Sequence, residues 1–97
     1  MSAFTKQPSE IFTVSMDFSR RLQGGETIAS KVVSAIITTT LADATATVID
    51  SSTINGTDID VKVKAGTTGL AYKITITITT STGNVFEDEI TMTVTEN

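Results

Sequence analysis

Residues 65–79 read Ala-Gly-Thr-Thr-Gly-Leu-Ala-Tyr-Lys-Ile-Thr-Ile-Thr-Ile-Thr. From Tyr72 onward, large apolar side chains alternate with Lys or Thr at period two, which on an extended chain directs every apolar group to one face. The β-branched residues in this run favour a pleated sheet over a helix. Gly66 and Gly69 precede the run and allow the positive φ angles of a sharp turn. The stretch therefore predicts a glycine-bracketed corner followed by a half-buried strand.

Tyr72 stands just beyond the corner, at the start of this strand. That position is typical of the tyrosine corner of immunoglobulin-like sandwiches, in which the ring packs inward and the hydroxyl bonds to upstream backbone. We therefore expect Gly66, Gly69 and Tyr72 to form a structural corner, with the Tyr72 hydroxyl hydrogen-bonded to nearby backbone.

The same alternation recurs on both sides of the corner. It predicts extended segments at residues 11–18, 28–37, 44–50, 52–54, 58–65, 72–79 and 86–95. Residues 28–37 carry apolar groups on both faces, so either both faces are covered or a bulge switches them. Asn55-Gly56 predicts a type I′ hairpin turn. The pattern predicts an all-β, immunoglobulin-like antiparallel β-sandwich of about seven strands, with a small closed barrel as the alternative.

The chain length of 97 residues suits one domain. Residues 1–10 are polar and aperiodic and contain the only proline, so we expect a flexible N-terminal arm, with a frayed terminus as the alternative. Residues 11–97 are expected to form the single sandwich domain. The N-terminus has no apolar run of signal-peptide length, and no segment approaches the length of a membrane span, so we expect neither a signal peptide nor a membrane partner.

Composition argues against the commonest catalytic chemistries. The chain has no Cys and no His, which removes thiolate zinc sites, His acid–base catalysis and Ser-His-Asp triads. A net charge of −4 opposes binding to phosphate backbones, so nucleic acid is not an expected partner. The acidic residues Asp58, Asp60 and 87–89 match no calcium-binding loop. We expect no enzyme activity, no catalytic residues, no metal and no cofactor.

Four short motifs occur in order along the chain. They are Lys6-x-Pro8-x-Glu10, Asp17-Phe18-Ser19-x-x-Leu22, Gly25-Glu26-Thr27-Ile28-Ala29-Ser30, and Ala65-Gly66-Thr67 followed by Tyr72-x-Ile74, with Gly83 and Glu87 in the closing hairpin. This ordered set resembles the small immunoglobulin-like structural proteins of phages and prophages, and it is closest to the phage fibre-to-tail adaptor family. Gly69-Leu70-Ala71 makes the corner longer than that family's tight spacing.

The resemblance implies a non-enzymatic structural role, in which a β-sandwich attaches a fibre or an accessory protein to the tail of a phage or prophage particle. It implies other virion or tail proteins as partners, synthesis in the bacterial cytoplasm and a final location in the virion; homo-oligomer formation is left open. The alternative from another class is a carbohydrate-binding or cell-surface adhesion sandwich, which needs an exposed aromatic platform. Most of the five aromatic residues fall on core-facing positions, which argues against it.

The candidate interface residues lie in two segments: Lys6, Pro8 and Glu10 in the arm, and Asp17, Phe18, Arg20 and Arg21 after the first predicted strand. A polar, aperiodic arm contributes little to a core, so its share of the resemblance predicts contacts outside the domain. Arginines beside aromatics are enriched at interfaces, and their fork-shaped donors suit partner carboxylates; a solvated turn is the alternative. Deleting residues 1–9 is expected to leave the sandwich folded and to abolish assembly.

Overall fold

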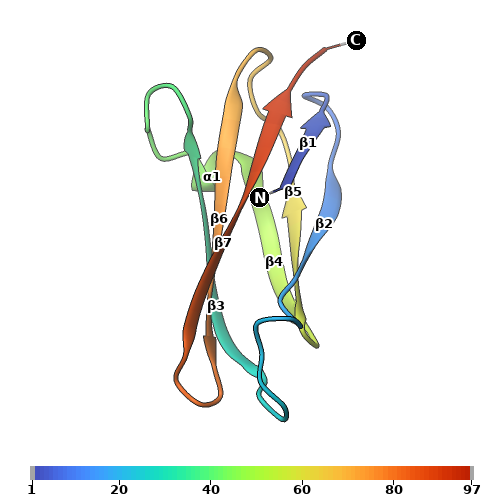
Figure 1. The fold of residues 1–97 in the computed structure, drawn as a ribbon. Helices are drawn as coiled ribbons and strands as arrows, with labels where there is room; N and C mark the ends of the chain where they lie inside the picture. The colour runs from blue at the N-terminus through green and yellow to red at the C-terminus, as the bar shows by residue number, and fades with distance from the viewer. Residues whose placement is uncertain (1, 97) are drawn as a thin grey trace.

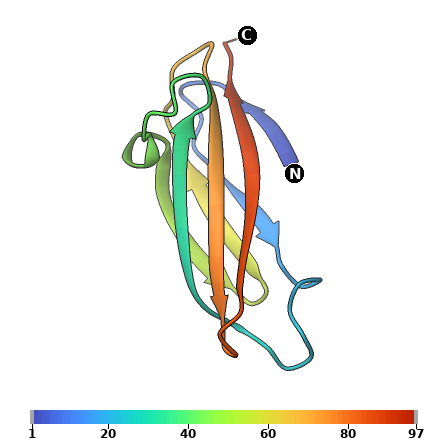
Figure 2. The ribbon, with the colours of Figure 1, turned by 60° about the vertical axis from the view of Figure 1, so that its left-hand side comes forward.

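The computed structural model describes residues 2–96 and contains two β-sheets packed face to face. Its elements are β1 (Ser2–Lys6), β2 (Phe12–Asp17), β3 (Ile28–Ile37), α1 (Thr45–Val48), β4 (Ile49–Asn55), β5 (Asp58–Val63), β6 (Ala71–Thr80) and β7 (Val85–Val94). Figure 1 shows their arrangement, and Figure 2 shows the larger sheet in front of the smaller one. The larger sheet has the order β1-β7-β6-β3 and the smaller one β2-β5-β4. The predicted all-β, two-layer sandwich is confirmed, and the immunoglobulin-like label stays a prediction.

The core lies between the two sheets, and β6 supplies its centre. Along β6, every second residue is buried and the residues between them are half-exposed, as the alternation predicts. Each fully buried aliphatic side chain contributes about 1.5–3 kcal/mol relative to exposure. The buried apolar residues of the three main contributing strands are Tyr72, Ile74, Ile76 and Ile78 of β6, Ile90, Met92 and Val94 of β7, and Ile59, Val61 and Val63 of β5.

β1 lies within residues 1–10, the segment for which the sequence predicts a flexible arm. It pairs with β7 in parallel, from Ser2 opposite Ile90 to Lys6 opposite Val94, whereas the sequence predicts antiparallel pairing throughout. Phe4 packs against the core and Lys6 is buried, while Ala3 and Thr5 are exposed. The inward lysine hides the alternation, because a charged residue at that position indicates a solvent-facing side chain.

α1 and the start of β4 replace the strand predicted at residues 44–50. Asp43 Oδ1 accepts hydrogen bonds from the Thr45 N–H at 3.2 Å and the Thr45 hydroxyl at 2.7 Å, which favours a turn over an extended chain. Ala44 and Val48, four residues apart, are both buried, as one helical turn allows. Among residues 2–96, no helix has the length and apolar character needed to cross a membrane.

The structure also settles the two alternatives for β3 and corrects the predicted turn between β4 and β5. A bulge between Ile28 and Ser30 resolves the mixed pattern of β3 in favour of a switch of faces. In the β4–β5 hairpin, Asn55 pairs with Asp58, so the two central residues of the turn are 56 and 57. Only Gly56 of these has a positive φ, 63°, which indicates a type II′ turn. The predicted type I′ turn centred on Asn55-Gly56 is therefore wrong by one residue.

Candidate protein interface

The corner before β6 contains all three of its predicted residues. Tyr72 is 2% exposed, and its hydroxyl accepts a hydrogen bond from the Thr67 N–H at 2.9 Å. Gly66 has a φ of 97°, and a Cβ there would lie 2.7 Å from Val94 Cγ2. Gly69 has a φ of 90°, and its N–H donates to the Val94 carbonyl at 2.8 Å. The corner therefore ties the β5–β6 connection to the end of β7 and has an internal, structural role.

Lys6, the first candidate interface residue, is only 1% exposed. Its Nζ donates to the carbonyl oxygens of Ala65 at 2.5 Å, Gln7 at 2.7 Å and Pro8 at 3.2 Å. An ammonium group has three N–H donors, so all of them have acceptors within the chain. Burial lowers the pKa of Lys6, and the negative charge of Glu10 opposes that shift. Lys6 therefore holds the β1–β2 turn together and is not exposed to a partner.

Glu10 closes the same turn from its outer side. Its Oε1 accepts a hydrogen bond from the Gln7 N–H at 2.7 Å, and its own N–H donates to the Gln7 carbonyl at 3.1 Å. A polar hollow of about 260 Å³ opens beside the turn and is lined by Thr5, Lys6, Gln7, Glu10 and Thr95. Glu10 is exposed and Pro8 is half-exposed, so these two candidate residues form the accessible surface of this end.

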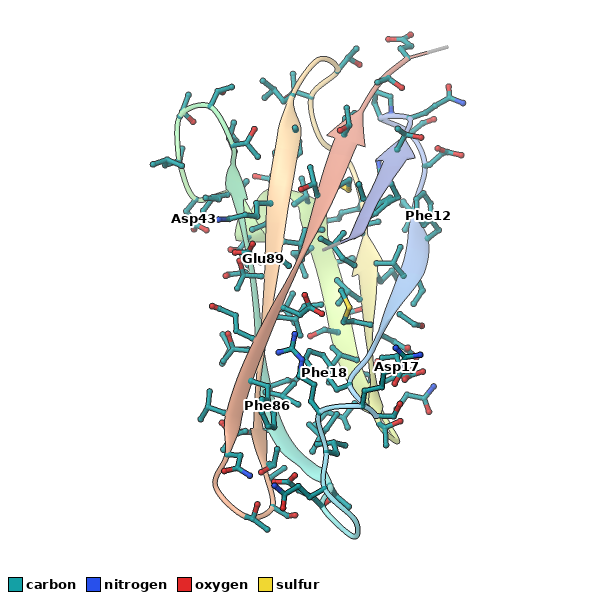
Figure 3. The ribbon with its side chains drawn as sticks, in the orientation of Figure 1. Phe12, Asp17, Phe18, Asp43, Phe86 and Glu89 are labelled. Carbon is teal, nitrogen blue, oxygen red and sulfur yellow. The ribbon has the colours of Figure 1, made fainter. Side chains whose placement is uncertain are left out.

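At the other end of β2, Asp17 and Phe18 point in opposite directions. Phe18 is 1% exposed and belongs to the core, whereas Asp17 is exposed. Figure 3 shows Phe18 between the sheets and Asp17 beside β2. Asp17 Oδ1 accepts a hydrogen bond from the Ser19 N–H at 2.7 Å, and this bond lowers the pKa of Asp17. Phe18 is therefore not available to a partner, and its place in the predicted alternation already put it on the core face.

Arg20 and Arg21 follow on the same loop and differ in their contacts. Arg21 Nη1 donates to the Glu87 carbonyl at 3.1 Å, and Arg21 Nη2 lies 3.9 Å from Asp88 Oδ2. This guanidinium contacts β7 at residues 87 and 88, in the part of its edge that β1 does not reach, since β1 pairs only with residues 90–94. Arg20 is exposed and makes no ion pair within residues 2–96. Arg20 is therefore the one of the two arginines whose charge is not paired within the described residues.

Glu26 is a buried carboxylate that sequence reasoning did not single out as a site residue. It accepts hydrogen bonds from the Thr80 and Thr82 hydroxyls, from the Asn84 amide at 3.0 Å and from the Gln23 N–H at 2.9 Å. These bonds, those of the two hydroxyls first, lower the pKa of Glu26 from 4.5 to about 2. The network joins the loop between β2 and β3 to the β6–β7 turn. Its only signal in the sequence is the place of Glu26 in the Gly25–Ser30 motif.

The structure does not bring the seven candidate interface residues into one patch. Pro8 and Glu10 lie before β2, and Asp17, Arg20 and Arg21 lie at or beyond its end. The remaining two, Lys6 and Phe18, are buried. Across the described residues, no group of three or more His, Cys, Asp or Glu side chains is arranged to hold a metal ion. The accessible features are thus polar loops at the two ends of β2, and β2 itself runs between them.

Comparison with curated proteins finds no match for this chain. The family model of the podophage GP4 fiber-tail adaptor protein gp77 matches residues 6–93 of the 97. The matched span contains both accessible ends of β2, the Glu26 network and the Tyr72 corner. It confirms the resemblance inferred from the ordered motifs. The chain therefore belongs to the podophage GP4 fiber-tail adaptor protein family.

Proposed function

We propose that this protein is a non-enzymatic structural adaptor that attaches a fibre or an accessory protein to the tail of a phage particle. The family match over residues 6–93 carries this proposal. Membership of the family implies binding to other virion proteins and a place in the virion.

The shape of the domain supports an adaptor role. The molecule measures 44 × 23 × 21 Å, and its accessible polar loops lie toward opposite ends of the long axis (Figure 1). An adaptor contacts two proteins at once, and an elongated domain separates two such contacts. The dense internal hydrogen bonding of Lys6 and Glu26 at the two ends supports a rigid connector.

No observation favours the carbohydrate-binding alternative. Phe18 and Tyr72 are buried, and Phe4, Phe12 and Phe86 are partly buried and pack against the core. Phe4 and Phe12 also pack edge to face, with ring centroids 5.7 Å apart. The five aromatic rings of the chain therefore contribute to packing, and they form no exposed platform on which a sugar ring could stack.

The test is an add-back experiment with particles assembled from a phage in which this gene is deleted. Such particles are expected to lack bound fibre or accessory protein, and the purified wild-type chain should restore it, as measured by immunoblotting and by infectivity. Deletion particles that carry a normal complement of tail proteins would contradict the proposal. Binding of the purified chain to host surface polysaccharide, without binding to particles, would instead support the carbohydrate-binding alternative.

A further inference from the structure

The two sheets end in four terminal strands, β1 and β3 in the larger sheet and β2 and β4 in the smaller one. A terminal strand presents backbone N–H and C=O groups that can pair with another chain. Proteins usually protect such a strand against pairing with a bulge, a charge, a short length or a covering segment. The four terminal strands of this protein differ in how far they are protected against such pairing.

Three of the terminal strands, β3, β4 and β1, have features that protect them against pairing with another chain. β3 has a bulge at its start, carries Lys31 on its inner face opposite Ile78, and is covered near its end by residues 42–45, whose backbone and Thr45 side chain bond to it. β4 has a bulge between residues 49 and 51. β1 has only five residues and ends on the inward-facing Lys6. By contrast, β2 pairs with β5 in an unbroken register and contains no Lys and no Pro.

The register shows which backbone groups of β2 face outward. Lys64 directly follows β5, and Val48 directly precedes β4. The Lys64 N–H donates to the Val48 carbonyl at 2.9 Å, so the backbone of residue 64 points toward β4. Along a strand, the backbone N–H and C=O groups of successive residues point to opposite sides. The odd-numbered residues of β5 therefore form their backbone hydrogen bonds with β2, where their partners are Phe12, Val14 and Met16. The backbone groups at residues 13, 15 and 17 therefore point away from the sheet.

These outward groups are accessible. Thr13, Ser15 and Asp17 are all exposed, and within residues 2–96 their backbone makes no hydrogen bond outside the β2–β5 ladder. In Figure 1, β2 forms the right-hand margin of the ribbon. Donors and acceptors that alternate along a straight edge are complementary to the backbone of an extended strand.

Charge indicates what kind of strand fits. Three carboxylates lie on the outer face of the β2–β5 ladder, because Asp17 pairs with Asp58, and Ser15 pairs with Asp60 and donates its hydroxyl to Asp60 Oδ1 at 2.6 Å. Lys62, opposite Thr13, is the one cation of this ladder, so the ladder is net acidic. The whole chain carries a net charge of −4. A strand that carries Lys or Arg therefore complements this edge, whereas a second copy would bring two acidic edges together.

We propose that β2 receives an extended, Lys- or Arg-bearing strand of another virion protein, through backbone hydrogen bonds to Thr13 and Ser15. The smaller sheet thereby gains a fourth strand. This inference rests on the proposed adaptor function, because it names the surface and the kind of partner that the adaptor uses.

The test uses Thr13→Pro, which removes one outward N–H and leaves the hydrogen bonds between β2 and β5 in place. Thr13→Ala keeps the N–H and is the side-chain control. The even-numbered residues of β5 form hydrogen bonds with residues 51, 53 and 55 of β4, so the backbone N–H of Ser52 points away from the sheet. Ser52→Pro therefore removes an unpaired edge N–H from β4 and is the control for the backbone change. With deletion particles as the probe, Thr13→Pro is expected to lose roughly tenfold or more in affinity. Both control variants should bind like the wild type.

Hydrogen exchange gives an independent measurement should Thr13→Pro fold poorly. The Thr13 and Ser15 amides of the wild-type chain should exchange rapidly in the free protein and slowly on the particle. If the wild type binds but these amides stay unprotected and Thr13→Pro binds equally well, the edge-docking proposal is overturned. Protection of the same amides by self-association of the purified chain would also overturn it, in favour of a second copy. If the wild type does not bind particles at all, the adaptor function itself fails.

Discussion

Glu26 is a carboxylate buried at one end of the sandwich, with four hydrogen-bond donors around it. Its pKa is lowered from 4.5 to about 2, so the folded state binds its proton less readily than the unfolded state does. The resulting stabilisation is fully present above pH 4.5 and is lost as the pH falls toward about 2.

Glu26→Gln is therefore expected to lower the melting temperature at neutral pH, because the charge-assisted hydrogen bonds are lost. The difference in melting temperature between wild type and variant should stay constant above about pH 5 and shrink between about pH 4.5 and pH 2. Thermal unfolding of both proteins over this range measures it. Other titrating groups, such as Asp17 and Asp43, are common to both proteins and cancel in the difference. A difference independent of pH would contradict the low pKa.

Tyr72→Phe removes only the hydroxyl that accepts the Thr67 N–H. Thr67 is exposed, so water can reach its freed N–H, and we expect a loss of about 1 kcal/mol in the free energy of unfolding. Urea denaturation measures this loss. Thr67→Ala keeps the backbone donor and serves as a control with little expected effect. Equal stability of Tyr72→Phe and wild type would show that the corner bond is not stabilising.

The burial of a residue can be predicted from the sequence where it follows a local pattern, and it cannot where it depends on distant contacts. Phe18 continues the alternation of β2 and could be assigned to the core from that pattern. Lys6 could not, because its burial depends on the Ala65 carbonyl, 59 residues away along the chain. Glu26 is equally inaccessible to local patterns, since three of its donors come from residues 80–84.

At the scale of elements, the corner before β6 uses two glycines for different reasons. Both have positive φ, but a Cβ at Gly66 meets Val94 at 2.7 Å, whereas a Cβ at Gly69 meets nothing within 4 Å. Gly69→Ala should therefore cost only the backbone strain, about 1–2 kcal/mol. Gly66→Ala should cost more because it adds overpacking, typically about 1–3 kcal/mol. Chemical denaturation of the two variants tests the order, and the reverse order would contradict it.

β1 gives the second prediction at this scale. Deleting residues 1–6 removes five backbone partners of β7 and the partly buried Phe4, so we expect the free energy of unfolding to fall by about 2–4 kcal/mol. Urea denaturation measures it, and Ala3→Ser on the exposed face of β1 is the neutral control. An unchanged free energy would show that β1 lies outside the cooperative unit, as the sequence alone suggests.

The elements that the sequence predicts well are those with strict, local alternation. β6 and the end of β7 follow the predicted pattern because each apolar residue is buried against the opposite sheet. The missed elements depend on distant contacts. β1 needs a parallel partner at the far end of the chain, and α1 replaces a strand because Asp43 bonds to Thr45 while Ala44 and Val48 pack inward.

At the scale of the whole molecule, the acidic side chains are spread over opposite outer faces. Asp58 and Asp60 alternate with the buried residues of β5, and Glu87 and Glu89 lie on the outer side of β7. Because these pairs face away from each other across the sandwich, they cannot share one ion. Millimolar calcium should therefore shift the melting temperature by less than about 1 °C. Differential scanning fluorimetry with magnesium as the control measures this shift, and a calcium-specific rise of several degrees would contradict it.

The buried Lys6 affects how contacts in the assembled particle can be mapped by covalent chemistry. The chain has five lysines, and amine-reactive cross-linkers need an accessible, deprotonated amine. Lys6 Nζ is enclosed by three carbonyls, so reagents of this type reach Lys6 only after β1 opens. The exposed Lys62, which pairs with Thr13 near the start of β2, remains accessible in the folded state. A missing cross-link from Lys6 is therefore no evidence that the β1–β2 turn lacks a neighbour in the particle. Carboxyl-directed coupling through the exposed Glu10 reaches the same end in the folded state.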